Sequence, residues 1–144
     1  MFEAVGEKYW PTFFDQVRNC LKPGGTAGLQ IITINDNDFD AYRTDPDFIQ
    51  KHIFPGGMLP SPSALENVTA SAGLEHLRQR IFAQDYARTL AEWRKQFIAS
   101  WSSIKELGFD ERFRRLWEFY LHYCEAGFSC DYIDVRQIVY QRPH

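Results

Sequence analysis

The 144-residue sequence predicts an incomplete α/β fold. Apolar residues at helical spacing alternate with short runs rich in β-branched residues, which is typical of helices packed on a sheet. The predicted order is helix, strand, long loop, helix, strand, two helices and strand. Three strands are too few to cover so many apolar helix faces, and no Gly-rich turn follows a first strand. We therefore expect the second half of a domain.

The first helix is predicted from about residue 7 to residue 21, with Phe13, Val17 and Cys20 on one face. Pro11 falls in its first turn, where the missing N–H does no harm. The motif "KPGG" ends this helix. The run "TAGLQIITI" follows, is rich in Ile and is bounded by turn signals, so it predicts a buried strand.

Residues 35–61 are predicted to form a long loop. They mix Asp, Asn, Pro and Gly with aromatic residues and have no sustained hydrophobic period. Loops of this length in compact domains are usually lids or binding loops. Ser61 and Pro62 then begin a short helix, and Gly73 is expected to end it.

The rest of the chain predicts a strand, two helices and a last strand. The run "LEHLRQRIF" predicts the first of these strands. Apolar residues at helical spacing from Tyr86 to Ile104 predict a strongly amphipathic helix. Asp110 is expected to cap the next helix, and "CDYIDVRQIVYQR" has the β-branched and aromatic content of a final strand.

Composition excludes several classes of function. The formal net charge is −3 and no stretch is densely basic, which argues against nucleic-acid binding. The most basic segment, "ERFRRLW", is interpreted as a solvated helix face, with an anionic-lipid contact as the alternative. No apolar run has membrane-spanning length and no signal peptide is present, so we expect a cytoplasmic protein. The many aromatic side chains supply a core or line an apolar pocket.

The cysteines do not predict a metal site. Cys20, Cys124 and Cys130 are odd in number, and His122 lies only two residues from Cys124 with no other ligand nearby. Reduced thiols in a cytoplasmic protein are the expectation.

Five motifs together resemble one enzyme family: "MFEAVG", "LKPGG", "IFPGGMLPS", "DYARTLAEW" and "FYLHYCEAGF". The family is the cyclopropane-fatty-acyl-phospholipid synthases, which include the mycolic acid cyclopropane synthases. The resemblance is to their C-terminal half and covers essentially the whole chain. "LKPGG" alone is common among S-adenosylmethionine-dependent methyltransferases, whereas "MFEAVG" together with "IFPGGMLPS" is more specific.

The resemblance implies the C-terminal part of a seven-strand class I methyltransferase fold, with about three strands and flanking helices. Residues 1–144 would be a partial methyltransferase domain with a lid-like loop at about 35–61. The N-terminal cofactor-binding half would be missing, so the residues that bind S-adenosylmethionine are expected upstream of Met1.

The resemblance also implies the chemistry. Family members transfer a methyl group from S-adenosylmethionine to the cis double bond of an unsaturated fatty acyl chain of a phospholipid, which leaves a carbocation. A bound bicarbonate ion is the base. It removes a proton from the newly added methyl group, and the cyclopropane ring then closes. Carried over to this sequence, Glu3, Gln30 and Tyr86 hold the bicarbonate, with a backbone contribution near Ile32. Many members have histidine where this chain has Gln30, an amide that cannot become cationic.

The substrate surface implied by the resemblance lies in the lid-like loop. Its expected apolar contacts with the acyl chain are Tyr42, Phe48, Phe54 and Met58, which would shield the cation from water. Peripheral contact with the inner membrane and a homo-oligomer are further expectations.

Simpler interpretations stay open for the same residues. Glu3 suits a helix N-terminus because of the macrodipole. Tyr86 suits the apolar stripe of its helix, and a buried amide at Gln30 needs hydrogen-bond partners in any fold. Two other functions are also open: a related lipid methyltransferase that gives a branched methyl product, and a catalytically dead segment that self-associates through an open sheet edge.

Overall fold

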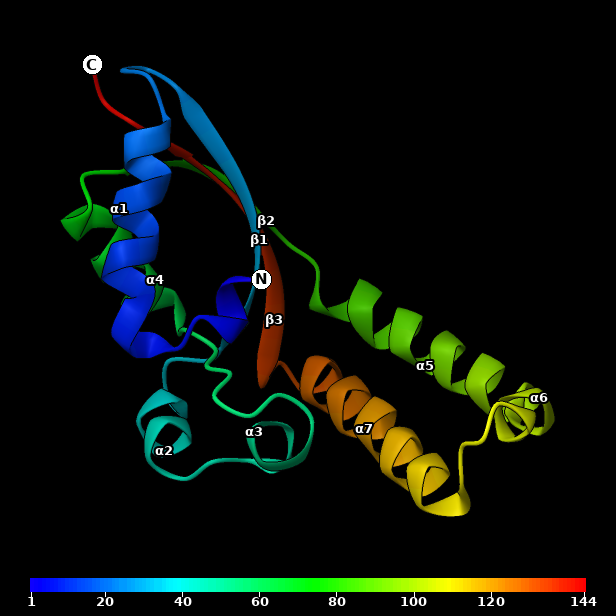
Figure 1. Cartoon of the computed structure of the whole chain (residues 1–144). Coiled ribbons are helices and arrows are strands. Elements are labelled where there is room, and N and C mark those ends of the chain that lie inside the picture. Colours follow the sequence, from blue (N-terminus) through cyan, green and yellow to red (C-terminus); the bar gives the residue numbers. More distant parts are fainter. The chain divides into compact units, whose positions relative to one another are not determined.

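The computed structural model describes residues 1–144, which divide into two compact units (Figure 1). The sheet unit comprises residues 1–81 and 133–144, and the helical unit comprises residues 82–132. Each unit is described by itself. None of the helices combines the length and the apolar character that crossing a bilayer requires.

The sheet unit is built on three strands, as predicted, and they pair antiparallel. They are β1 (Thr26–Ile34), β2 (Glu75–Ile81) and β3 (Ile133–Gln141), and their order in the sheet is β1-β3-β2. The register pairs Gln30 with Gln137 on one side of β3, and Arg80 with Gln137 on the other. The last strand in sequence therefore lies in the middle of the sheet.

Two helices, α1 (Trp10–Cys20) and α4 (Pro62–Ser71), cover one face of this sheet (Figure 1). Phe14 of α1 is fully buried, and its ring centroid lies 6.1 Å from that of Tyr140 on β3. Ile31 and Ile138 are buried on the same face. Large apolar side chains enclosed in this way supply the main stabilisation of the unit.

The other face of the sheet is exposed in this unit. Successive side chains of a strand point to opposite faces, and Gly28 and Gln30 of β1 point away from the helices and are exposed. The prediction of a fully buried first strand is thus right for the face that bears Ile31 and wrong for the face that bears Gln30. The interpretation of Gln30 as a buried amide is therefore also wrong, because its side chain lies on the exposed face.

Local signals place the ends of the helices as expected. Pro11 lies in the first turn of α1, which is preceded by the short 3-10 helix η2 (Glu7–Tyr9). Ser61 caps α4, because its hydroxyl oxygen accepts the Ala64 N–H at 3.2 Å. Gly73 follows α4 with a φ of 71°, a conformation that favours glycine.

The segment 35–61, expected as a loop, contains two short helices, α2 (Phe39–Thr44) and α3 (Phe48–His52). Each is only five or six residues long, too short to produce a visible hydrophobic period. The N-terminus of α3 has a capping box, in which Asp47 and Gln50 exchange side-chain to backbone hydrogen bonds.

The helical unit consists of α5 (Ala83–Ala99), α6 (Trp101–Glu106) and α7 (Glu111–Ser129). The prediction of a single helix from Tyr86 to Ile104 is wrong, because the helix is interrupted at Ser100, between α5 and α6. The predicted cap of α7 is confirmed: a carboxylate oxygen of Asp110 accepts the Phe113 N–H at 2.8 Å. Leu90 and Leu121 are buried in this unit.

Candidate functional site

Glu3 lies in the 3-10 helix η1 (Phe2–Ala4), and both its side chain and its backbone are engaged. Its Oε1 accepts the backbone N–H of Ile32 at 2.9 Å, and its Oε2 lies 3.1 Å from the Met1 ammonium nitrogen. The side chain is 22% exposed. The carboxylate is therefore held at the outer edge of β1 and remains accessible.

The two most specific motifs of the sequence are in direct contact. The Met58 N–H donates to the Glu3 carbonyl at 2.8 Å, and the Gln50 side-chain amide donates to the Gly57 carbonyl at 3.0 Å. A Cβ at Gly57 would meet the Phe54 carbonyl oxygen at 3.0 Å, a tight contact that favours glycine there. "MFEAVG" and "FPGGM" are thus joined by a backbone hydrogen bond.

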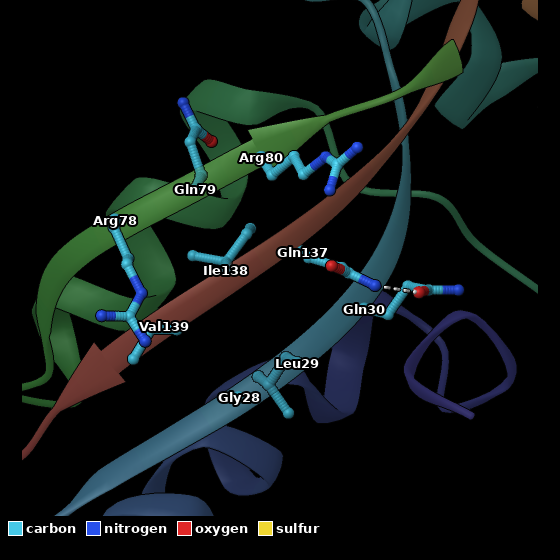
Figure 2. A pocket seen from close by; sticks show the side chains of 9 residues that line it. All are labelled: Gly28, Leu29, Gln30, Arg78, Gln79, Arg80, Gln137, Ile138 and Val139. Carbon is cyan, nitrogen blue, oxygen red and sulfur yellow. Dashed lines mark hydrogen bonds between the residues drawn. The ribbon is translucent and has the colours of Figure 1, made fainter. Parts of the chain in front are cut away.

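Gln30 lines a groove on the exposed face of the sheet (Figure 2). The groove has a volume of about 420 Å³ and is lined by Gly28, Leu29, Gln30, Arg78, Gln79, Arg80, Gln137, Ile138 and Val139. The Oε1 of Gln30 accepts a hydrogen bond from the Gln137 side-chain amide at 3.0 Å. The amide nitrogen of Gln30 is its hydrogen-bond donor.

The electrostatics of this groove favour anions. Arg78 and Arg80 come from alternate positions of β2 and are both exposed, and no acidic residue lines the groove. The sequence analysis missed these two arginines. The alternation in "LRQRI" was the available signal, because residues two apart in a strand share a face.

The structure brings the Glu3 carboxylate to the edge of β1, near Gln30. Glu3 is bonded at Ile32, two residues beyond Gln30, which corresponds to roughly 7 Å along the strand. Gln30 lines the groove, whereas Glu3 is not among its lining residues.

Tyr86 lies in the helical unit and is half-buried between two aromatic rings. Its ring centroid lies 5.7 Å from that of Phe82 and 5.3 Å from that of Phe128. Its grouping with Glu3 and Gln30 stays a prediction.

The four residues expected to contact an acyl chain differ in exposure. Tyr42 and Met58 are buried, whereas Phe54 is 56% exposed. Phe48 is half-buried, with its ring centroid 5.3 Å from that of His52. Tyr42 and Met58 therefore pack in the interior of the sheet unit, and their role in substrate binding stays a prediction.

Trp10 is another residue that the sequence analysis did not single out. Its ring is 3% exposed and stacks on Phe39, with centroids 6.4 Å apart, yet its Nε1 has no hydrogen-bond partner. No motif signals an indole left without an acceptor.

Comparison of the sequence with known proteins gives a consistent picture. The family model described as "Mycolic acid cyclopropane synthetase" matches residues 1–138. The tuberculostearic acid methyltransferase UfaA1 of Mycobacterium tuberculosis is 42% identical over 138 residues, which are 95% of this chain and 32% of that protein. The cyclopropane-fatty-acyl-phospholipid synthase of Escherichia coli K12 is 35% identical over 144 residues, 99% of this chain and 36% of that protein. The chain thus spans about a third of the length of these relatives.

Solved structures agree with the sequence comparison. The cyclopropane synthase MmaA2 from Mycobacterium tuberculosis has a TM-score of 0.87 and 28% identity, over 97% of this chain and 52% of that one. The mycolic acid cyclopropane synthase CmaA1, solved with SAH and CTAB, gives the same values. This similarity confirms the expected α/β fold class.

Proposed function

The chain belongs to the mycolic acid cyclopropane synthetase family, and we propose that its protein methylates the cis double bond of an unsaturated fatty acyl chain of a phospholipid. The product is a cyclopropane ring. S-adenosylmethionine would supply the methyl group, and a bound bicarbonate ion would supply the basic oxygen that removes a proton. The family match over residues 1–138 carries this proposal.

Glu3 is proposed as the carboxylate that orients the bicarbonate. Its hydrogen bond to Ile32 at 2.9 Å fixes one oxygen, and its second oxygen can accept the O–H of a small oxyanion. A backbone group near Ile32 was expected to contact the ion itself. Because that N–H is bonded to Glu3, we assign it to positioning the carboxylate.

Gln30 and Tyr86 are proposed as hydrogen-bond donors to the same ion. The Oε1 of Gln30 accepts from Gln137, which directs the amide nitrogen away from Gln137. The nearby Arg78 and Arg80 make the surroundings of Gln30 positive, which favours an anion. A carboxylate, an amide, a phenol and local positive charge are chemically suited to hold bicarbonate.

Residues 1–144 are proposed as a partial methyltransferase domain, with residues 35–61 as a lid. The Met58 N–H bond to the Glu3 carbonyl supports the lid role, because it ties this segment to the carboxylate. A lid over the reacting double bond would exclude water that otherwise captures the cation.

A related lipid methyltransferase with a branched methyl product is the second candidate. It is favoured by the 42% identity to a relative named for methyl transfer and not for ring formation. Gln30 suits this alternative, since an amide at that position cannot carry a proton.

The isolated 144 residues are proposed to be inactive and to self-associate. The Ile32 and Ile34 N–H groups at the outer edge of β1 are bonded to Glu3 and to the Pro60 carbonyl. The N–H groups of Thr26 and Gly28 point to the same edge, where no strand pairs with β1. An edge of this kind recruits a strand from another chain.

We also propose that the protein is located in the cytoplasm.

The activity is tested in a chimera in which this chain replaces the matching 36% of the E. coli synthase. The chimera is expressed in cells without a synthase of their own, and the fatty acids are analysed by gas chromatography and mass spectrometry. We expect cyclopropane fatty acids. Branched acids would establish the second candidate, and unmodified lipids from a chimera that binds S-adenosylmethionine in calorimetry would overturn both.

Variants of the chimera test the residues. Glu3→Gln and Tyr86→Phe are expected to lower kcat by about 100-fold, the low end of general acid–base effects. Tyr9→Phe, on a tyrosine that is 53% exposed, is the matched control. Equal rates for Tyr86→Phe and Tyr9→Phe would exclude Tyr86 from the site.

A further inference from the structure

Two apolar side chains are exposed at the tip of the helical unit, in the turn between α6 and α7. Leu107 is 78% exposed and Phe109 is 43% exposed. Helices α5 and α7 pack side by side, so this turn lies at the opposite end of the unit from residues 82 and 132, where the chain enters and leaves it (Figure 1). Apolar groups gathered on a protruding tip mark a contact surface.

The tip is held in place by aromatic packing. The Phe109 ring centroid lies 4.4 Å from that of Phe113, which stacks on Trp117 at 5.6 Å. The buried Trp101 donates its indole N–H to Glu111 at 3.1 Å. A surface that is already ordered loses little conformational entropy when it binds.

Cations surround the apolar turn. Three of them are exposed and make no ion pair or side-chain hydrogen bond: Lys105, Arg112 and Arg115. A fourth, Arg114, lies 3.6 Å from Glu111 and over the Trp101 ring at 5.5 Å. The unpaired positive charges are therefore available to a partner.

The acidic residues of the turn are mostly engaged within the unit. Asp110 caps α7, and Glu111 bonds Trp101 and Arg114. Glu106 is the one carboxylate of the turn without a partner. Four cations against three carboxylates leave residues 105–115 net positive, and three of the cations are unpaired.

We propose that this tip, residues 105–115, docks on the surface of a membrane that contains anionic phospholipids. Leu107 and Phe109 enter the interface, and the three unpaired cations meet lipid phosphates. A second copy of the chain is disfavoured, because it would oppose the same positive charges and because two side chains bury far less than the roughly 800 Å² per partner of a stable interface. The inference goes beyond the proposed catalysis, because the contact needs neither cofactor nor turnover.

The test is sedimentation of the chain with sucrose-loaded vesicles, either pure phosphatidylcholine or phosphatidylcholine with phosphatidylglycerol. We expect binding to the anionic vesicles that weakens as salt is raised. The double variant Leu107→Ser/Phe109→Ser and the double variant Arg112→Gln/Arg115→Gln should each bind about tenfold more weakly. Leu107→Trp should bind severalfold more tightly, because Trp favours the interface, and a misfolded variant would not show this gain.

Matched controls use exposed residues elsewhere. Leu77→Ser changes a leucine that is 47% exposed on β2, and Lys22→Gln/Arg88→Gln removes two exposed cations outside the tip. Both should bind like the parent chain. Equal binding by Leu107→Ser/Phe109→Ser and the parent, or equal losses in the tip and control variants, would overturn the proposal. A parent chain that ignores anionic vesicles but loses a dimer in Leu107→Ser/Phe109→Ser would overturn it in favour of a second copy.

Discussion

The carboxylate of Glu3 and the backbone N–H of Ile32 are joined by a hydrogen bond of 2.9 Å, although 29 residues separate them in sequence. This bond connects the first turn of the chain to the outer edge of β1. The Glu3 carbonyl meanwhile accepts the Met58 N–H, so one residue links three segments of the sheet unit.

We expect Glu3→Ala to lower the free energy of unfolding by about 1.5 kcal/mol, because it leaves the Ile32 N–H without a charged acceptor. Urea unfolding followed by circular dichroism measures this. Glu7→Ala is the control, since Glu7 pairs with Arg43 on the surface and should cost under about 1 kcal/mol. Equal losses in the two variants would show that the Ile32 bond adds no stability of its own.

Self-association is expected to depend on the open part of the β1 edge. Gly28→Pro removes an N–H that points away from β3, so it should block edge pairing and leave the β1–β3 ladder intact. Gly28→Ala keeps the N–H, and its added Cβ meets nothing within 4 Å, so this variant should associate like the parent. Sedimentation velocity measures the degree of self-association. Equal self-association of the Gly28→Pro and Gly28→Ala chains would contradict edge pairing.

Stability is expected to fall in strong base because of a buried tyrosine. Burial raises the pKa of Tyr140 from 10.0 to about 12, and its side chain is 3% exposed. The unfolded chain loses this proton near pH 10 and the folded chain near pH 12. The stabilisation is therefore complete below about pH 10 and is lost as the pH rises from about 10 to 12, by up to roughly 2 kcal/mol.

Urea unfolding at several pH values measures this loss. Tyr140→Phe should reduce it, although not abolish it, because burial also raises the pKa of Tyr120 to about 12. Tyr9→Phe, at an exposed tyrosine, should leave the pH profile unchanged. The expectation fails if Tyr140→Phe and Tyr9→Phe give the same profile.

In the chimera with the E. coli synthase, Gln30→His should add a pH dependence. Imidazole gains a proton near pH 6.5 and would then hold an anion more tightly than the amide does. The rate measured from about pH 5.5 to 8 should show an added inflection that the parent lacks. Gln30→Ala should lower the rate about tenfold or more without that inflection. Superimposable profiles for all three proteins would remove Gln30 from the proposed site.

Features that depend on neighbouring residues could be predicted from the sequence. The cap of α4 at Ser61, the cap of α7 at Asp110 and the stop at Gly73 follow from short patterns, because their stabilising contacts lie within one turn. The three strands were also predicted from short runs, although the hydrogen bonds that hold them come from distant segments. The motifs also identified the family, and with it the C-terminal part of a class I methyltransferase fold.

Which surfaces are covered and which distant residues meet depends on how the elements pack, and the sequence did not predict it. It exposed Gln30 where a buried strand was predicted, and it aligned Arg78 and Arg80 beside Gln30 across the sheet. It also gave the Glu3 carboxylate its partner on β1. Periodicity reports that a strand has two faces but not whether a helix packs on each, and no local pattern encodes a bond between segments far apart in the chain.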